Sequence, residues 1–236
     1  MKEKTSCHVG YGIMPRYSMI NGTSMLTLYI YEHCPFCARV RYVAGLLHIP
    51  VEEKVLAYDD VATPTALIGK KAVPILVKAD GTAMGESLDI IHYLLGLKLQ
   101  SLAPQTVSDE VADWQSQAFP LLQQVGYPRW HQLGLGEFLT LNSRQQWQQN
   151  KETDALNFER LIAEKDQIAA QVSEHIAAVE ALLFPAQGVA SLLDEAVIYS
   201  LLRGWICLPE IEWPERVMTW LRRRSVATGV SVMMAD

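Results

Sequence analysis

The fold is decided by the stretch Tyr29-Ile30-Tyr31-Glu32-His33-Cys34-Pro35-Phe36-Cys37-Ala38-Arg39-Val40-Arg41. The β-type run Leu26 to Tyr31 ends in it, and Ala38 to Leu47 reads as a helix because apolar residues recur on one face. Pro35 suits the first helical turn, where a backbone N–H has no intrahelical partner to lose. Two cysteines therefore lie where a strand turns into a helix.

The position of Cys34 favours its reactive form. It comes just before the helix, beside unpaired backbone N–H groups and the positive end of the helix dipole. Cysteines in such places have pKa values of roughly 3.5–7.5, against about 8.5 for a free thiol. We therefore expect Cys34 to attack disulfides as a thiolate. Cys37, one turn further on and more enclosed, would resolve the mixed disulfide.

Two other interpretations of the cysteine pair are open. Both residues could be small hydrophobic members of the core, but the proline between them and the strand-to-helix position argue against this. The pair could be half of a zinc site, which needs two further ligands at suitable spacing. The remaining cysteines, Cys7 and Cys207, each stand alone and far away in the sequence. We therefore predict a redox pair and no metal site.

Length and composition set limits on the class of protein. The 236 residues suffice for two domains with sizeable cores, and half of them are apolar, as in globular proteins. The net charge of −6 gives no reason to expect nucleic acid as a partner. We find no run long and apolar enough to cross a membrane and no secretory signal. Four cysteines that include one close pair favour a reducing compartment, so we predict a cytoplasmic protein.

The order of expected elements up to about Leu97 is of the thioredoxin type. Strand Leu26 to Tyr31, helix Pro35 to Leu47 and strand Val51 to Leu56 form a βαβ unit with parallel strands. A short helix ending near Gly69 follows, and then a hairpin with Asp80-Gly81 at its turn. The last helix of this part spans Leu88 to Leu95.

The rest of the chain reads as helical throughout. The candidate helices are Asp109 to Gly126, Gly136 to Gln149, Lys151 to Phe184, Leu192 to Leu208 and Trp213 to Ala227. All six tryptophans fall here, and we assign most of them to helix packing and the domain interface. We thus predict an α/β plus all-α protein. Its parts would be a disordered extension (1–24), a thioredoxin-like domain (25–99), a linker (100–107) and an all-helical domain (108–236).

The motifs resemble those of one family. Cys34-Pro35-Phe36-Cys37 resembles the Cys-Pro-Tyr-Cys site of dithiol glutaredoxins, with Phe in place of Tyr. The added helical domain makes the chain similar to the glutaredoxin 2 type, bacterial dithiol glutaredoxins with a glutathione-transferase-like two-domain fold. The likeness runs from Met25 to the C-terminus, and is weaker in the helical half.

The resemblance implies a glutathione site made of Pro35, Phe36, Val73, Pro74, Glu86 and Ser87. The Val73–Pro74 bond would be cis, and the strand edge before Pro74 would leave the backbone of Val73 free to pair with an extended peptide. The helix start at Glu86-Ser87 suits an anion such as the γ-glutamyl carboxylate, although Ser87 could instead be only an N-cap. Arg39 and Arg41 could hold the glycyl carboxylate or merely line a solvated helix face.

The function implied is glutathione-dependent thiol–disulfide exchange. Protein disulfides and glutathionylated proteins would be reduced through Cys34 and Cys37, with glutathione as the reductant and co-substrate. The sequence carries no metal, flavin or nicotinamide motif. A glutathione transferase and a non-catalytic glutathione-binding protein are the alternatives, and neither needs a resolving Cys37. By resemblance we expect a monomer.

Overall fold

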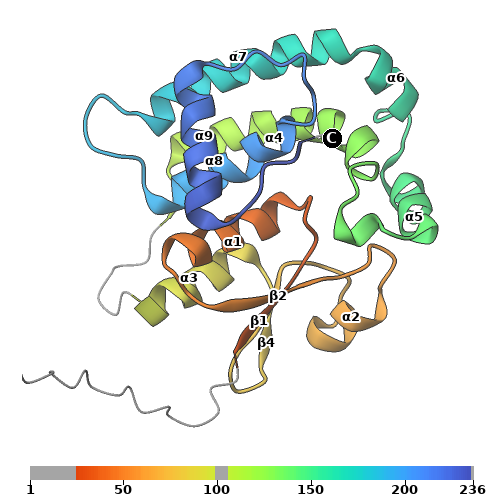
Figure 1. The fold of residues 1–236 in the computed structure, drawn as a ribbon, viewed down its shortest axis with the longest axis vertical. Coiled ribbons are helices and arrows are strands. Elements are labelled where there is room, and N and C mark those ends of the chain that lie inside the picture. Colours follow the sequence, from red (N-terminus) through yellow and green to blue (C-terminus); the bar gives the residue numbers. More distant parts are fainter. Residues whose placement is uncertain (1–24, 99–105, 235–236) are drawn as a thin grey trace, which may run out of the picture.

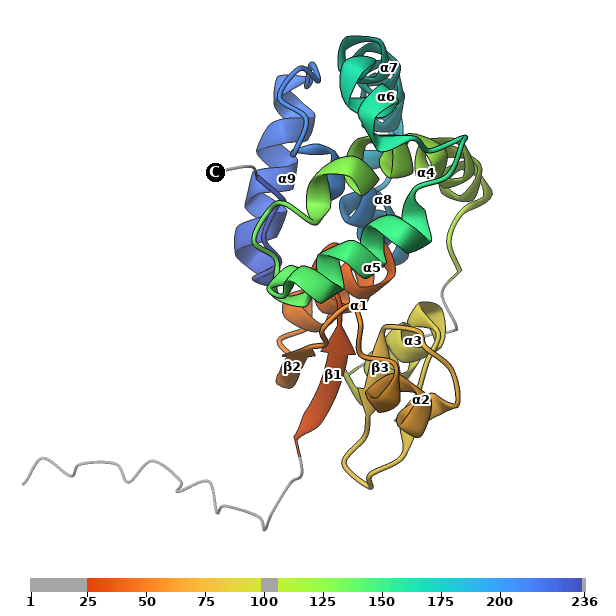
Figure 2. The same ribbon diagram turned by 90° about the vertical axis from the view of Figure 1, so that its right-hand side faces the viewer.

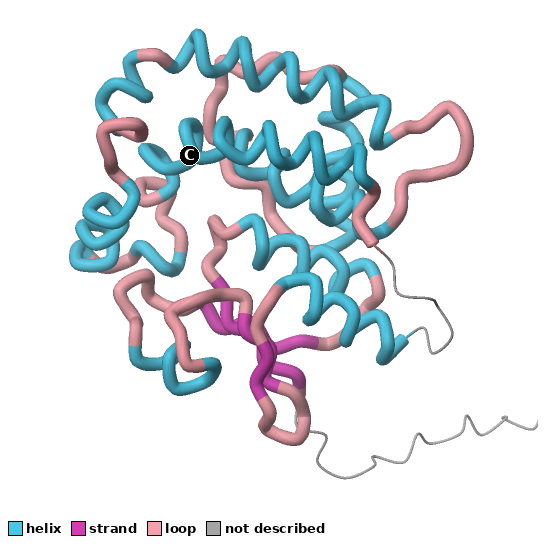
Figure 3. Tube along the Cα trace, turned by 180° about the vertical axis from the view of Figure 1, so that it is seen from behind, coloured by secondary structure: helices cyan, strands magenta, loops and turns pink. Residues whose placement is uncertain are grey.

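The computed structural model describes residues 25–98 and 106–234. The expected N-terminal extension (1–24) and residues 100–105 of the expected linker lie outside the described residues. Figure 1 shows two parts, a sheet with flanking helices below and a group of helices above. Seen from behind in Figure 3, the strands of the described chain are confined to the lower part. The predicted combination of a thioredoxin-like domain and a helical domain is therefore confirmed.

The sheet has the strand order β2-β1-β3-β4. β1 pairs with β2 in parallel, so the predicted βαβ unit is confirmed, and β3 pairs antiparallel with both β1 and β4. Gly81, with φ of 85°, makes the predicted hairpin turn between β3 and β4. The four strands are β1 (Leu26–Ile30), β2 (Val51–Val55), β3 (Ile75–Val77) and β4 (Ala83–Met84).

Three helices complete this domain: α1 (Pro35–Leu46), α2 (Ala62–Ile68) and α3 (Ser87–Lys98). α1 lies between the sheet and the helical domain (Figures 1 and 2), where it packs against α3, α8 and α9. α2 packs against β3 and β4. The Val73–Pro74 peptide bond before β3 is cis, as the resemblance implies.

The helical domain contains α4 (Asp109–Trp130), the 3-10 turn η1 (Gly136–Phe138), α5 (Leu141–Lys151), α6 (Phe158–Ala163), α7 (Lys165–Leu183), α8 (Leu192–Trp205) and α9 (Glu215–Thr228). α8 runs through the middle of this domain and is buried over most of its length. Among the helices of the described residues, none is both long and apolar enough to cross a bilayer.

Three helix predictions differ most from the structure. α4 runs on past Gly126 to Trp130, whose side chain packs directly against that glycine. The expected helix Gly136 to Gln149 is split by Thr140, whose hydroxyl caps the Ser143 N–H at 3.0 Å and begins α5. The expected helix Lys151 to Phe184 is broken in the same way, because Asn157 caps the Arg160 N–H at 2.8 Å and begins α6.

One apolar core joins the two domains. It extends from the sheet through α1 into α8 and α4. Tyr42 of α1 packs on Tyr199 of α8 with ring centroids 4.9 Å apart, and its hydroxyl donates to Glu195 Oε2 at 2.7 Å. α1, and with it the cysteine pair, is thus held on both sides.

Candidate active site

Cys34 lies at the N-terminal end of α1, as predicted. It is the N-cap residue, with extended backbone, and its Sγ accepts a hydrogen bond from the Cys37 N–H at 3.4 Å. The two cysteines are not joined by a disulfide. Cys34 is 8% exposed at the edge of a cavity, whereas Cys37 is completely buried behind it. The two sulfurs therefore differ in access in the way that an attacking and a resolving cysteine require.

The two thiols also differ in acidity. Hydrogen bonding from Cys37 is the largest influence on Cys34, and together with the nearby His33 it lowers the Cys34 pKa to about 6, although burial acts in the opposite direction. The Cys37 pKa is raised, first by burial and then by its interactions with Cys34. At neutral pH the thiolate is therefore at Cys34.

The loop before Cys34 is held by a buried carboxylate that no pattern in the sequence indicates. Glu137 of η1 has no exposed surface, and its Oε1 lies 2.7 Å from His33 Nδ1. The same carboxylate accepts the backbone N–H of His33 at 2.9 Å and that of Glu32 at 3.0 Å. Burial acts to raise the pKa of Glu137, but these bonds and His33 lower it overall, so the carboxylate is ionised.

Two further residues of the helical domain contact this loop. Arg203 of α8 donates to the Glu32 carbonyl at 2.8 Å, and the Gly136 N–H donates to the Glu32 carboxylate at 2.5 Å. A Cβ at Gly136 would lie 2.9 Å from Val55 Cγ1, so glycine allows η1 to approach the sheet this closely. The helical domain therefore helps to shape the site, although it carries neither of the paired cysteines.

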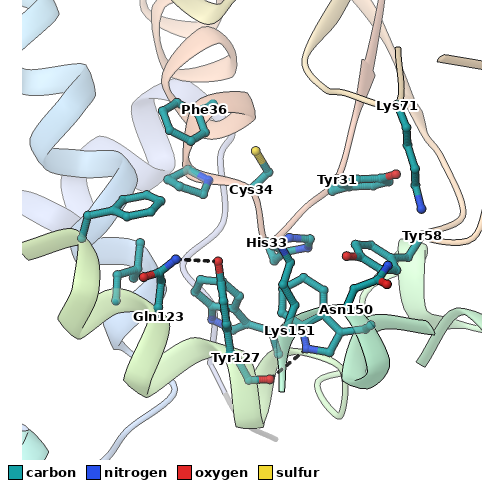
Figure 4. Close-up of a pocket in the computed structure, with 15 residues that line it drawn as sticks. Tyr31, His33, Cys34, Phe36, Tyr58, Lys71, Gln123, Tyr127, Asn150 and Lys151 are labelled. Atoms are coloured by element: carbon teal, nitrogen blue, oxygen red, sulfur yellow. Dashed lines mark hydrogen bonds between the residues drawn. The ribbon is translucent and has the colours of Figure 1, made fainter. Parts of the chain in front are cut away.

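Cys34 faces a cavity of about 270 Å³ between the two domains (Figure 4). Trp130 and Trp147 are among the tryptophans for which we predicted a role in helix packing and the domain interface. They are fully buried and form part of the cavity wall. Figure 4 shows Lys71 and Tyr58 on one side of Cys34, and Gln123 and Tyr127 on the other. The cavity is lined by Tyr31, His33, Cys34, Pro35, Phe36, Tyr58, Lys71, Phe119, Leu122, Gln123, Tyr127, Trp130, Trp147, Asn150 and Lys151.

A second, smaller groove of about 140 Å³ contains most of the residues predicted to bind glutathione. Phe36 lines both spaces, whereas Pro35 lines only the larger cavity. The groove is lined by Phe36, Ile68, Lys70, Ala72, Val73, Pro74, Glu86 and Ser87. Five of the six predicted residues thus come together, and Pro35 lines the larger cavity instead.

The start of helix α3 contradicts the alternative that Ser87 is only an N-cap. Glu86, with φ of 61°, is the residue whose carbonyl accepts the first helical bond, from Ile90 at 3.0 Å. Ser87 is therefore the first residue inside the helix and not its N-cap. The Glu86 side chain is exposed and forms an ion pair with Lys70 at 2.8 Å.

The two arginines considered for the glycyl carboxylate point elsewhere. Arg39 is buried, donates to Gln115 at 3.1 Å and places its guanidinium 4.8 Å from the centre of the Phe36 ring. Arg41 forms an ion pair with Glu53 at 2.8 Å. Neither lines the groove or the cavity. Within the described ranges, no group of three or more His, Cys, Asp or Glu could hold a metal ion.

Comparisons with known proteins cover both halves of the chain. The family model for the C-terminal domain of glutaredoxin 2 matches residues 110–235, and that for the N-terminal domain of glutathione S-transferase matches residues 28–100. Glutaredoxin 2 of Escherichia coli (strain K12) is 33% identical over 210 residues, which cover 88% of this chain and 98% of that protein.

Solved structures of the same two kinds of protein are similar to this chain. The crystal structure of glutaredoxin 2 from Salmonella typhimurium in complex with glutathione is similar with a TM-score of 0.81 and 31% identity, covering 88% of this chain and 96% of that one. A theta class glutathione S-transferase from Xanthomonas axonopodis pv. citri is similar with a TM-score of 0.54 and 19% identity, covering 88% and 97% of the two chains. The latter likeness shows the shared fold.

Proposed function

The chain belongs to the glutaredoxin 2 family and is a glutathione-dependent thiol–disulfide oxidoreductase, and we propose that Cys34 and Cys37 perform this chemistry. The observation that carries the assignment is the asymmetry of the pair: Cys34 opens onto a cavity with its pKa lowered to about 6, while Cys37 is buried behind it. One sulfur can attack, and the other can only react with what the first has bound.

The reaction begins when the Cys34 thiolate attacks one sulfur of a disulfide. A bond from Cys34 Sγ to that sulfur forms, and the other sulfur leaves as a thiolate that takes up a proton. With a protein disulfide, Cys37 then attacks Cys34 Sγ, which releases the reduced protein and leaves a Cys34–Cys37 disulfide. Two molecules of glutathione restore the dithiol and leave as glutathione disulfide.

The glutathione peptide lies in the smaller groove in this proposal. The backbone of Val73, just before the cis Pro74, is not part of the sheet, so it can pair with an extended peptide. Ser87 then presents its N–H and hydroxyl to the γ-glutamyl carboxylate at the start of α3, where the helix dipole favours an anion. Glu86 faces the same groove and can pair with the γ-glutamyl ammonium.

The opposite end of the peptide reaches Lys71 rather than Arg39 or Arg41. Lys71 precedes Val73 by two residues, and it lines the cavity with its Nζ 4.6 Å from the centre of the Tyr58 ring. The hydroxyl of Tyr31 is buried beside the same space, with no hydrogen-bond partner among the described residues. We assign the glycyl carboxylate to this pair.

Substrates of this site are glutathione mixed disulfides and disulfides in protein segments that can enter the space between the domains. The small exposed fraction of Cys34, 8%, selects for flexible segments over rigid surfaces. Because the pair works only when kept reduced by glutathione, we assign the protein to the cytoplasm, where it would act as a monomer.

The test compares two reactions of the purified chain. We expect glutathione-dependent reduction of a glutathione mixed disulfide and negligible conjugation of glutathione to a chloronitrobenzene acceptor. A glutathione transferase would show the reverse, and a non-catalytic binding protein would show neither while still binding glutathione. Either of these results would overturn the proposal.

A further inference from the structure

Two lysines from different domains face the cavity beside Cys34. Lys71 comes from the loop before β3, and Lys151 is the last residue of α5. Lys151 Nζ lies 5.3 Å from the centre of the Tyr127 ring and 5.6 Å from that of Trp147. In the part of the chain that the structure describes, neither lysine forms an ion pair with a carboxylate. The described residues that line the cavity therefore include two positive groups and no carboxylate, and the Cys34 thiolate is the negative group among them.

The electrostatics of these lysines agree with the geometry. Burial lowers the pKa of both lysines. For Lys71 the neighbouring Asp59 and Asp60 act in the opposite direction, and Lys151 lowers its pKa further. The charge of Cys34 acts in the opposite direction on Lys151. A negatively charged ligand in the cavity would relieve the repulsion between the two ammonium groups.

Glutathione accounts for only one of the two lysines. Its glycyl carboxylate is assigned above to Lys71 and Tyr31, next to the groove that takes the rest of the peptide. Lys151 lies instead among the aromatic rings of α4 and α5, where Tyr127 and Trp147 pack with centroids 5.1 Å apart. Phe119 and Gln123 of α4 also line the cavity.

We propose that this α4–α5 part of the cavity binds the other half of a glutathione mixed disulfide, and that this half is a small aromatic thiol with a carboxylate. The inference rests on the proposed function. The aromatic rings favour an aromatic or apolar body, and Lys151 supplies the partner for its carboxylate. A cavity of about 270 Å³ is near the lower end of ligand pockets, roughly 300–1,000 Å³, so the occupant is small.

The chemical step follows from this placement. The Cys34 thiolate attacks the glutathionyl sulfur, because the glutathione half is held in the groove by Val73. A bond from Cys34 Sγ to that sulfur forms as the bond to the aromatic sulfur breaks. The aromatic thiolate leaves with the electron pair into the cavity beside Lys151. A second glutathione then attacks the sulfur bound to Cys34 and leaves as glutathione disulfide, which restores the thiolate.

The test uses two mixed disulfides of glutathione that differ in one carboxylate: that of 5-thio-2-nitrobenzoate and that of uncharged 4-nitrothiophenol. Both release a coloured thiolate, so stopped-flow absorbance with the reduced protein gives the rate constant for Cys34 attack on each. We expect the carboxylated probe to react about tenfold faster, as one hydrogen bond to a charged group implies. In Lys151→Met the ratio of the two rate constants should fall to about one, and Lys151→Arg should restore it.

The controls separate this inference from the proposed function. Lys78→Met removes a lysine that packs on an aromatic ring outside the cavity, Tyr93 at 4.9 Å, and should keep the native ratio. Lys71→Met should slow both probes and keep the ratio, because both contain glutathione. If the native protein reacts with both probes at equal rates, or if Lys151→Met keeps the native preference, the inference is wrong while the proposed function stands. If the native protein reacts with neither probe, both fail.

Discussion

His33 Nδ1 of the active-site loop lies 2.7 Å from Oε1 of Glu137 in the helical domain, and neither side chain has appreciable contact with solvent. The Glu137 carboxylate also accepts two backbone N–H groups of the same loop. His33 in turn lowers the pKa of Cys34. The helical domain is therefore linked through Glu137 and His33 to the acidity of the attacking sulfur.

Replacing Glu137 should affect both stability and acidity. Glu137→Gln keeps the size of the side chain but removes the charge and leaves buried donors without an acceptor. Removing a partner from buried hydrogen-bonded groups costs about 1–3 kcal/mol, and more where a charge is involved. We expect a lower Tm and an upward shift in the pH midpoint of Cys34 alkylation, since His33 is no longer held beside the sulfur. Glu53→Gln, at a surface ion pair with Arg41, should change neither by much. An unchanged alkylation midpoint in Glu137→Gln would show that this link does not exist.

The lowered Cys34 pKa predicts a specific pH dependence. Iodoacetamide reacts with the thiolate, so its rate should rise as the pH passes about 6 and level off below pH 8, where an ordinary thiol is still largely protonated. Relative to Cys34→Ser, the reduced protein should gain stability between about pH 6 and the ordinary thiol value near 8.5, because only the unfolded chain binds the proton there. This gain is fully present above that range and lost below pH 6. A midpoint near 8.5 would contradict the described environment of Cys34.

Glycine at position 136 should be required for the contact between the domains. In Gly136→Ala the new Cβ would lie 2.9 Å from Val55 Cγ1 and 3.1 Å from Glu32 Oε2. Such overpacking costs roughly 1–3 kcal/mol, which urea unfolding can measure. The matched control is Gly96→Ala in α3, where no atom lies within 4 Å of the new Cβ and helix propensity favours alanine by about 1 kcal/mol. Equal effects of the two substitutions would mean that η1 moves freely.

Ser87 tests the glutathione groove separately from thiol chemistry. Ser87→Ala keeps the backbone N–H at the start of α3 and loses the hydroxyl. A lost hydrogen bond to a charged group costs roughly 1.5–3 kcal/mol, so KM for glutathione should rise about 10- to 150-fold. The pH midpoint of Cys34 alkylation should stay where it is, because Ser87 lines the groove and not the cavity. If KM does not change, the γ-glutamyl group lies elsewhere.

The parts of the structure that could be predicted from the sequence depend on local patterns. The strand, turn and helix around Cys34 follow from apolar periodicity and from Pro35, and the hairpin follows from Asp80-Gly81. The helix limits around Thr140 and Asn157 were missed because a single capping side chain in a polar stretch is a weak signal.

The site residues that could not be predicted from the sequence have partners far away in the chain. Glu137 is separated from His33 by 104 residues, and it becomes a buried partner only when the two domains pack together. Glutamate is seldom fully buried, so nothing in its sequence context indicated this role. Lys71 and Lys151 likewise meet only in the folded chain. His33 directly precedes the cysteine pair, and this position indicates a role in the site. Its partner Glu137 could not be found from one sequence.

The most direct test of the central claim measures Cys34→Ser and Cys37→Ser on two substrates, a glutathione mixed disulfide and a protein disulfide. We predict that Cys34→Ser loses activity on both, because the attacking thiolate is gone. Cys37→Ser should lose the protein disulfide but keep much of its activity on the mixed disulfide, since glutathione can release the intermediate on Cys34. Equal losses in both variants on both substrates would contradict the division of roles between the sulfur that faces the cavity and the sulfur that is buried behind it.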